Sequence, residues 1–524
     1  MNKPNILLIF ADQMRFDAMG MMGNPIIHTP NLDRLAAGGV LFKNAITPAP
    51  LCTPARSCTI LGHNASYIGA YGNSEPIHYP AGEALPHLLK EQGYFTQAIG
   101  KMHFGGPPYE VSHGFDDMIL SEEMRGLRMA QSADEVVFDH YDRYLMDNKR
   151  WGWEKPTEIG YNEIKPTISP LEKKYHVTQW CGDETVKWLN DERPKDSPFF
   201  LWTSFVKPHV PYDCPRHLIG MYDEDKMPDA HISQLDGTHK NPLFADYIDE
   251  QEYNLYSKKA AKRALAHYYA NITFIDEQVG RILGALDQQN IAENTLVIFT
   301  ADHGDMMGDH GLWYKSFGYE GSVHIPMIAR WPGVLPEGEI CGGTTSLVDL
   351  YPTILAAAGG DDINAEKRPG ISLLDVSAAK ERDLCISEMF RGKKYVMHAR
   401  TKKWKLLFHA NGGFLELYDL ENDPYEMIDL AEKQEYSGII ADLKKQCEKY
   451  LMKYGDASQL LDEGGALKEY EYEPNKKGFA PRPFSRMPWD YRLPPAELSD
   501  DEKGWFWRDV DGDWATIFRK MTQK

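Results

Sequence analysis

The chain has no long apolar run. None of its 524 residues lie in a segment that approaches the roughly 18 uninterrupted apolar residues that a membrane-spanning helix needs. The first apolar run, Asn5–Phe10, is too short for the core of a secretory signal peptide. It is also followed by polar residues rather than by a cleavage site of small residues. We therefore expect a cytoplasmic protein that has no membrane as a partner.

Cysteine is scarce. The seven cysteines are scattered, and neither their odd number nor their spacing suits a disulfide framework or a paired CxxC zinc site. Most of them are expected to be small buried hydrophobic residues. Two cysteines, Cys52 and Cys58, flank a proline and an arginine in the stretch LCTPARSC. A redox pair is one interpretation of this stretch, and Cys52 needs another.

An excess of positive charge is also missing. The 57 Lys and Arg residues are outnumbered by 77 Asp and Glu residues, which gives a formal net charge of −20. Such a charge argues against nucleic acid or an anionic membrane as a partner, so any anionic ligand must be held by local positive charge. The 42% hydrophobic and 26% charged residues are typical of a globular protein with room for a second domain.

Four apolar runs, rich in β-branched and aromatic residues, each end in a polar cluster. They are Asn5–Phe10, Phe95–Ile99, Phe199–Val206 and Thr295–Thr300. Helical patterns lie between them, at Thr29–Gly38, Ala84–Gln92, Val177–Asn190 and Ala260–Asp287. Strands that alternate with helices predict an open α/β sheet with buried parallel strands. Because ligands bind beyond the carboxyl ends of such strands, we expect the four polar clusters to converge.

The polar clusters supply two kinds of chemical group. Taken singly, each has a structural explanation, since a strand-end Asp often caps a helix and a lone His is more often structural than a ligand. Together they supply an oxygen-rich set typical of Ca²⁺ or Mg²⁺ sites: Asp12, Gln13, Asp302 and His303. They also supply cations and acid/base groups: Lys101, His103 and His209. A metal among such groups is typical of a site for oxyanion transfer.

The stretch Cys52-Thr53-Pro54-Ala55-Arg56 resembles the C-x-P-x-R signature of the sulfatase family. In that family the cysteine is oxidised after translation to formylglycine, which implies a role for Cys52. The resemblance continues in order through NILLIFADQ, GKMH, KPHVP, ADHGD with GDHGLWYK, PMIARWPG, SLVDLYPT and ELYDLENDPYEMIDLA. It implies a sulfatase that hydrolyses sulfate monoesters and depends on a formylglycine-generating maturase. Cys58 matches no functional position and is expected to be structural.

The resemblance also implies an α/β fold of the alkaline-phosphatase-like type, with a large mixed sheet between helices and a smaller C-terminal α+β subdomain. We expect a catalytic domain over 1–375, a subdomain over 376–460, and an aromatic, proline-rich extension over 461–524 that packs on the body. Four segments suit an antiparallel meander and an amphipathic helix against it: Tyr395–His398, Trp404–Phe408, Leu415–Asp419 and Ile439–Tyr454.

The family's residue roles carry over to matching positions. A formylglycine at position 52 would hydrate to a diol, one hydroxyl of which attacks sulfur. The other roles are to deprotonate the second hydroxyl (His103), to hold the diol and the metal ligands (Arg56), to protonate the leaving alcohol (His209) and to neutralise sulfate oxygens (Lys101 and Lys315). The metal would be bound by Asp12, Gln13, Asp302, His303 and the modified Cys52. Lys101 and His103 are expected in an extended segment with both side chains on one side, and a surface position is the alternative for Lys315.

Two positions depart from the commonest family pattern. Gln13 stands where many sulfatases have a second aspartate, and His303 where many have asparagine. The neutral amide lowers the negative charge of the site, so the choice between Ca²⁺ and Mg²⁺ stays open. The Gln and His pair also resembles phosphonate monoester hydrolases, which usually lack the Lys-x-His pair of Lys101 and His103. A catalytically silent protein that binds sulfated sugars is a second alternative, which loss of the nucleophile would mark.

The acidic character of the chain bears on the substrate. A chain of net charge −20 should repel long polyanionic glycans. We therefore expect short sulfated sugars, with small aryl or alkyl sulfates as the alternative. The identity of the sugar, the position of its sulfate and the oligomeric state stay open.

Overall fold

A computed structural model describes residues 3–73, 77, 79–104, 111–123, 137–151, 164, 166–232, 258–362 and 364–474 of the chain. Most of the predicted extension over 461–524 lies outside the described residues, so its packing stays a prediction.

A mixed eight-stranded sheet forms the centre of the molecule, in the order β10-β2-β9-β8-β1-β6-β3-β4. Its strands are β1 (Asn5–Asp12), β2 (Val40–Ile46), β3 (Phe95–Gly100), β4 (Asp117–Leu120), β6 (Phe199–Pro208), β8 (Thr295–Ala301), β9 (Met327–Arg330) and β10 (Glu339–Ser346). Only β9 runs antiparallel to its neighbours. The four predicted strands are β8, β1, β6 and β3, which are adjacent and parallel. The prediction is confirmed, and their carboxyl ends meet at one edge.

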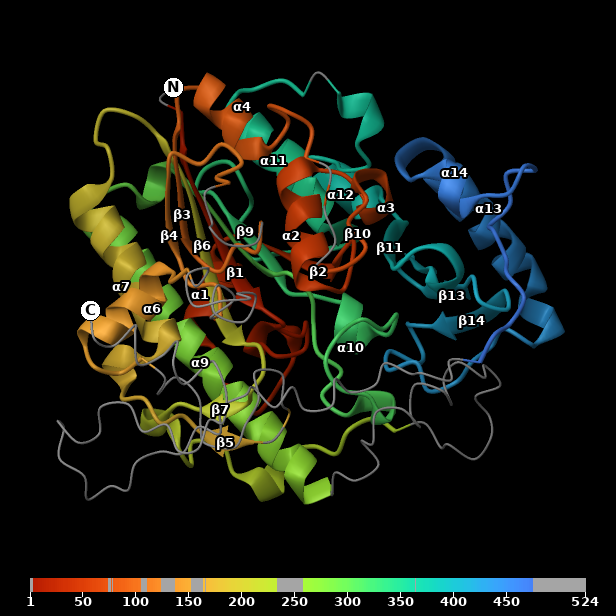
Figure 1. Cartoon of the computed structure of the whole chain (residues 1–524), viewed down its shortest axis with the longest axis horizontal. Coiled ribbons are helices and arrows are strands. Elements are labelled where there is room, and N and C mark those ends of the chain that lie inside the picture. The colour runs from red at the N-terminus through yellow and green to blue at the C-terminus, as the bar shows by residue number, and fades with distance from the viewer. Residues whose placement is uncertain are drawn as a thin grey trace.

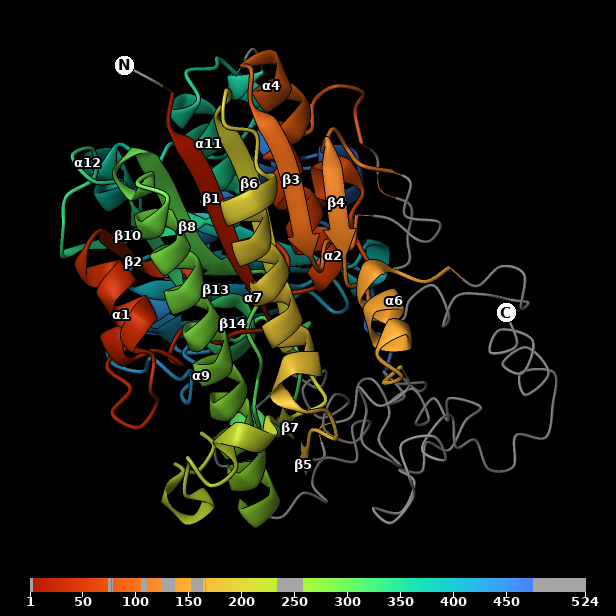
Figure 2. The same ribbon diagram turned by 90° about the vertical axis from the view of Figure 1, so that its left-hand side faces the viewer.

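Helices cover both faces of this sheet (Figure 2). One face carries α1 (Pro30–Ala37), α7 (Val177–Lys187) and α9 (Lys258–Gln288), and the other carries α2 (Cys52–Leu61), α4 (Leu85–Glu91) and α11 (Leu350–Ala357). The four predicted helices correspond to α1, α4, α7 and α9, and the helical path of α7 continues through a π-helical turn over Trp188–Glu192. Outside the sheet, the short strands β5 (Thr167–Ile168) and β7 (Asp213–Cys214) pair with each other.

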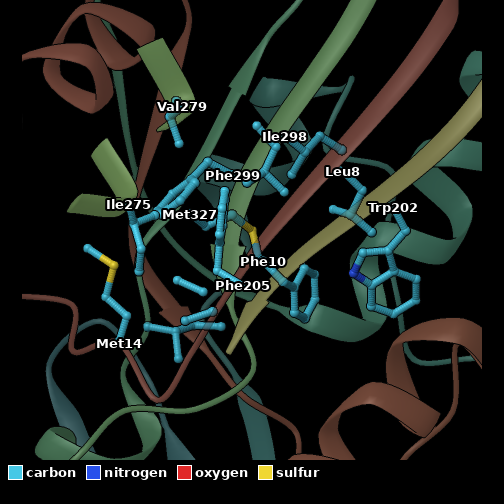
Figure 3. Packing of buried hydrophobic residues seen from close by; sticks show 14 of the residues in the cluster. Leu8, Phe10, Met14, Trp202, Phe205, Ile275, Val279, Ile298, Phe299 and Met327 are labelled. Carbon is cyan, nitrogen blue, oxygen red and sulfur yellow. The ribbon is translucent and has the colours of Figure 1, made fainter. Parts of the chain in front are cut away.

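The centre of the sheet is buried on both faces. Each of the eight residues of β1 is buried, which explains why this strand reads as a continuous apolar run rather than an alternating one. Figure 3 shows Leu8 and Phe10 beside Trp202, with Ile275 and Val279 of α9 packed over the neighbouring strands. This packing fixes the strands and therefore the positions of the residues that follow them.

A second, antiparallel sheet lies beside the first (Figure 1). It consists of β11 (Cys385–Met389), β12 (Val396–Arg400), β13 (Trp404–His409) and β14 (Phe414–Asp419), and α13 (Ser437–Tyr454) and the short α14 (Ala457–Leu460) follow it. The predicted meander and helix are confirmed, whereas β11 was not predicted. Buried residues of α13, such as Leu443 and Leu451, share one hydrophobic cluster with Phe408 and Leu417 of the sheet.

The cysteines match the expectation of small buried residues without a disulfide framework. All seven cysteines are free and buried, so Cys52 and Cys58 form no disulfide. Within the described ranges, the structure contains no helix that is both long enough and apolar enough to cross a membrane.

Candidate active site

Two carboxylates meet where β1 and β8 end. Asp12 is the last residue of β1 and Asp302 follows β8, and both side chains are fully buried. The backbone N–H groups of Gln13 and His303 both donate to Asp302 Oδ1, at 3.0 and 2.9 Å. Gln13 has a φ of 68°, so the chain turns sharply there. One carboxylate therefore ties the ends of two neighbouring strands together.

Cys52 begins α2 and points at this pair of strand ends. Its Sγ lies 3.2 Å from His303 Nε2 and 3.9 Å from Asp12 Oδ1. The other ring nitrogen of His303, Nδ1, lies 2.9 Å from the carbonyl oxygen of Gly304. Because a carbonyl only accepts, Nδ1 carries the proton and Nε2 turns its lone pair toward Cys52. Burial and the charge of Asp12 raise the pKa of the Cys52 thiol to about 11, so it is protonated at neutral pH.

These side chains fit a divalent cation. One ligand atom from each of Asp12, Cys52, Asp302 and His303 lies within 4.8 Å of the others. Two carboxylates and an imidazole lone pair that converge on one point are a suitable donor set for such an ion. Gln13 lies beside this group with its side chain engaged, since Oε1 accepts from Lys315 Nζ and Nε2 donates to Asp305, each at 2.5 Å. Of the predicted ligands, the structure brings four together and places the fifth next to them.

Arg56 lies one helical turn after Cys52 and is fully buried. Its Nε donates to Asp302 Oδ2 at 2.9 Å, and one terminal nitrogen lies 3.4 Å from Asp12 Oδ2. The other donates to the carbonyl of Lys101 and to Ser204 Oγ, at 2.5 and 2.7 Å. Burial opposes ionisation of Asp302, but the positive charges of Arg56 and Lys101 outweigh it and lower its pKa. Arg56 thus holds both carboxylates in place and favours the ionised form of Asp302.

Lys101 and His103 follow β3, but not in the predicted extended conformation. The strand ends at Gly100, and His103 has a φ of 56°, so that prediction is wrong. Glu122 causes the turn, because its Oε1 accepts from the N–H groups of Met102 and His103, at 2.9 and 3.0 Å. The Lys101 ammonium is fully buried and contacts Asp12. Burial lowers the pKa of Lys101, but Asp12 and a second carboxylate raise it well above its usual range.

His209 and Lys315 form a pair at the other side of the site. His209 Nε2 lies 2.6 Å from Lys315 Nζ, and its Nδ1 lies 2.8 Å from the carbonyl oxygen of Val210. Burial and the adjacent ammonium hold the pKa of His209 well below its usual value. Lys315 is half-buried and also contacts Gln13, so it is not the free surface lysine of the alternative interpretation.

Several residues of the site were not predicted from the sequence. Asp305 accepts from Gln13, from Tyr212 Oη at 2.6 Å and from two backbone N–H groups, and burial raises its pKa. It stands inside the ADHGD block, which could have revealed it. Glu122 and Glu123 follow β4, which shows the same pattern of an apolar run before a polar cluster but has only four residues. No sequence signal distinguishes Ser204 or Tyr212.

Comparisons with known proteins identify the family of this chain. The family model described as "Sulfatase" matches residues 4–360, and one described as "N-sulphoglucosamine sulphohydrolase, C-terminal" matches residues 308–453. The chain is 33% identical to an arylsulfatase of Clostridium perfringens over 489 residues, which cover 88% of this chain and 97% of the relative. It is 31% identical to a choline-sulfatase of Rhizobium meliloti over 451 residues, which cover 82% and 83% of the two chains.

Solved structures share the fold. A phosphonate monoester hydrolase of Agrobacterium radiobacter has a TM-score of 0.74 at 23% identity, with 89% of this chain and 100% of that chain covered. A structure in complex with its substrate D-glucosamine-2-N,6-O-disulfate has a TM-score of 0.64 at 22% identity, with 87% and 99% covered. The predicted α/β architecture of the alkaline-phosphatase-like type, with a large mixed sheet and a small antiparallel one, is confirmed. With a family model matched over residues 4–360 and a 33% identical arylsulfatase, the chain belongs to the sulfatase family and is a sulfuric ester hydrolase.

Proposed function

We propose that the protein hydrolyses sulfate monoesters of small sulfated sugars, and that its nucleophile is a formylglycine made from Cys52. The observation that supports this most directly is the position of Cys52, which is buried at the start of α2 within 3.2 Å of His303 Nε2. Arg56, Lys101 and Lys315 bring three cations to the same site. A separate maturase would oxidise the cysteine with its own oxidant.

One divalent cation would be held by Asp12, Asp302, His303 and the modified residue 52, with Gln13 beside them. The oxygen-rich donors favour Ca²⁺, with Mg²⁺ as the alternative. When bound, the ion supplies positive charge beside the nucleophile and the sulfate oxygens. Arg56 contributes without binding the ion, since it contacts both Asp12 and Asp302 and keeps them oriented.

A hydrated formylglycine at position 52 would supply one ionised hydroxyl to attack sulfur and a second hydroxyl whose deprotonation would expel sulfate and restore the aldehyde. His103 accepts the proton of that second hydroxyl. Lys101 and Lys315 stabilise the charge on the sulfate oxygens as the sulfur–oxygen bond to the alcohol breaks.

The leaving alcohol requires a proton, and His209 together with Lys315 can supply it. The carbonyl of Val210 faces His209 Nδ1, so Nδ1 keeps its proton and Nε2 shares one with Lys315 at 2.6 Å. The pair therefore holds one transferable proton at the side of the ring that faces Lys315. This proton matters most for a sugar alcohol, which leaves poorly as an anion.

The proposed substrate class rests on the acidic chain and on one neighbour. A net charge of −20 disfavours long sulfated polymers, and a structurally similar protein binds a disulfated glucosamine. The relatives named arylsulfatase and choline-sulfatase make small non-sugar sulfates the alternative. Phosphonate monoester hydrolysis is a second candidate function, favoured by the Gln13 and His303 pair and disfavoured by the presence of Lys101 and His103.

A single activity screen tests these alternatives. Enzyme produced together with a formylglycine-generating maturase is assayed on desalted sulfated mono- and disaccharides, choline sulfate, nitrophenyl sulfate and a phosphonate monoester. We expect the highest kcat/KM on a sulfated sugar. A higher kcat/KM for the phosphonate than for every sulfate ester, unchanged in Lys101→Ala, would contradict the proposal. Full conversion at residue 52 without turnover of any ester would favour the silent sugar-binding alternative.

A further inference from the structure

One carboxylate lies among three of the residues to which the proposed reaction assigns a role. Glu123 Oε2 is 2.7 Å from Lys101 Nζ and 3.3 Å from His103 Nε2, and Oε1 is 3.4 Å from His209 Nδ1. The side chain of Glu123 is only 6% exposed. A buried negative charge next to a site for an anionic ester is unfavourable in itself. The contacts with these three cationic or basic groups offset this cost.

Glu123 reaches these groups from a separate strand. It follows β4, whereas Lys101 and His103 follow β3 and His209 follows β6. Glu123 also has a φ of 55°, in the left-handed region that a residue with a long side chain rarely adopts. The adjacent Glu122 fixes the backbone of Met102 and His103, so the two carboxylates act on different parts of the same turn.

We propose that Glu123 is a positioning residue for ester hydrolysis, which orients His209 toward the leaving-group oxygen and holds Lys101 and His103 on the sulfate side of the site. This inference rests on the proposed function. His209 Nδ1 donates to the Val210 carbonyl at 2.8 Å, and the Glu123 carboxylate lies 3.4 Å from the same nitrogen. Both the hydrogen bond and the nearby negative charge favour the orientation in which Nδ1 carries the proton and Nε2 meets Lys315. Without the carboxylate, the hydrogen bond to Val210 alone favours this orientation among the contacts of the described residues.

The test is the dependence of the rate on the leaving group. Glu123→Gln keeps the size of the side chain and removes its charge. We expect kcat on the best sulfated sugar to fall by about 10- to 100-fold, the range typical of residues that orient metal ligands, with a much smaller change in KM. Nitrophenyl sulfate needs little protonation of its leaving group, so we expect the ratio of kcat/KM, sugar sulfate over nitrophenyl sulfate, to fall at least fivefold.

A double-mutant cycle identifies the partner. If Glu123 acts through His209, the ratio in Glu123→Gln/His209→Ala should equal that in His209→Ala alone, because the carboxylate then has no ring to orient. The matched control is Glu388→Gln, which makes the same change at a buried carboxylate whose partners are Ser66 and Tyr395. We expect this control to leave the ratio unchanged, and circular dichroism monitors folding of every variant.

The inference is overturned if folded Glu123→Gln keeps the ratio within twofold of the wild-type value, or if both esters slow equally. Glu123→Asp, which keeps the charge on a shorter side chain, is judged by the same ratio if the Gln variant does not fold. All enzymes are also assayed on phosphonate monoesters with alkyl and nitrophenyl leaving groups. A wild-type preference for phosphonates would overturn the proposed function alone, and the ratio on phosphonates would then decide the role of Glu123.

Discussion

Two networks of buried charge can be compared in this molecule. The first joins Asp12, Asp302 and Arg56 at the strand ends of the large sheet. In the second, Glu320 of α10 (Glu320–Val323) joins Arg400 and Lys405 of the small sheet, and Lys405 also contacts Glu426. Both networks are almost fully buried, and both hold acidic groups at shifted pKa values.

The networks differ in how completely their charges are paired. Glu320 meets Arg400 at 3.1 Å, Lys405 at 2.9 Å and the His324 ring at 2.8 Å, so two cations and an imidazole surround this carboxylate. The two carboxylates of the first network instead belong to a group of side chains whose ligand atoms converge: Asp12, Cys52, Asp302 and His303. Converging donors at the carboxyl ends of parallel strands indicate a site, whereas mutual pairing indicates a structural link between α10 and the small sheet. Burial of charge alone does not distinguish the two.

The nucleophile should give the largest effect. Cys52→Ala is expected to lower kcat/KM on sulfate esters by roughly 10⁴-fold or more, because it removes the attacking group, while the melting temperature changes little. Peptide mass spectrometry of the active wild type should show formylglycine at position 52. A fully active enzyme that carries only an unmodified thiol there would contradict the mechanism.

Substitutions of the predicted metal ligands should lower activity to different extents, according to the charge that each removes. Asp302→Asn keeps the shape of the side chain but removes a charge that a cation needs, so we expect activity to fall by about 100-fold or more and bound metal to be lost. Gln13→Ala removes a neutral amide and should lower activity by only about 10-fold. Elemental analysis of each protein checks retention of the ion.

Chelation of the wild type should lower both activity and melting temperature, because an ion that binds only the folded state stabilises it. Active enzyme that contains no divalent ion would show that the first network is no metal site.

Substitution of Glu320 in the second network should lower the stability of the protein rather than its activity. Glu320→Gln leaves Arg400 without a carboxylate partner among its described contacts and Lys405 with Glu426 alone, so we expect a loss of about 3–5 kcal/mol in the free energy of unfolding. Activity per folded molecule should stay within about threefold. Glu339→Gln, which breaks a half-exposed pair with Lys380, serves as the control and should change stability by less than about 1 kcal/mol. Equal losses in both variants would remove the distinction between the two networks.

The smallest expected effect is a dependence of stability on pH through Glu426. Burial, aided by the charge of Glu320 and opposed by Lys405, raises the pKa of Glu426 to about 7. Between its ordinary value of 4.5 and about 7, the folded state keeps a proton that the unfolded state has lost, so the contribution of Glu426 to stability falls as pH rises. The difference in free energy of unfolding between wild type and Glu426→Gln should decline by about 1–3 kcal/mol across this window. Denaturant unfolding at several pH values measures it, and a difference independent of pH would contradict the assignment.

The parts of the fold with strong local patterns were predictable. Strands β1, β3, β6 and β8 appear in the sequence as apolar runs because they are buried on both faces. Strand β11 was missed, since it follows the short helix α12 (Val376–Glu381) and pairs only with β12 within its own sheet. The extended segment expected for Lys101 and His103 was wrong because Glu122, 19 residues after His103, folds it into a turn.

By itself, the sequence determined which residues end the buried strands and which cysteine begins a C-x-P-x-R stretch. Apolar runs and short motifs are local, so both can be read along the chain. Only the tertiary structure decided that Cys52 Sγ faces His303 Nε2, that Lys315 pairs with His209 and that Glu123 lies among three groups from two other strands. These contacts join residues up to 251 positions apart, and they depend on strand order and backbone turns that no local pattern records.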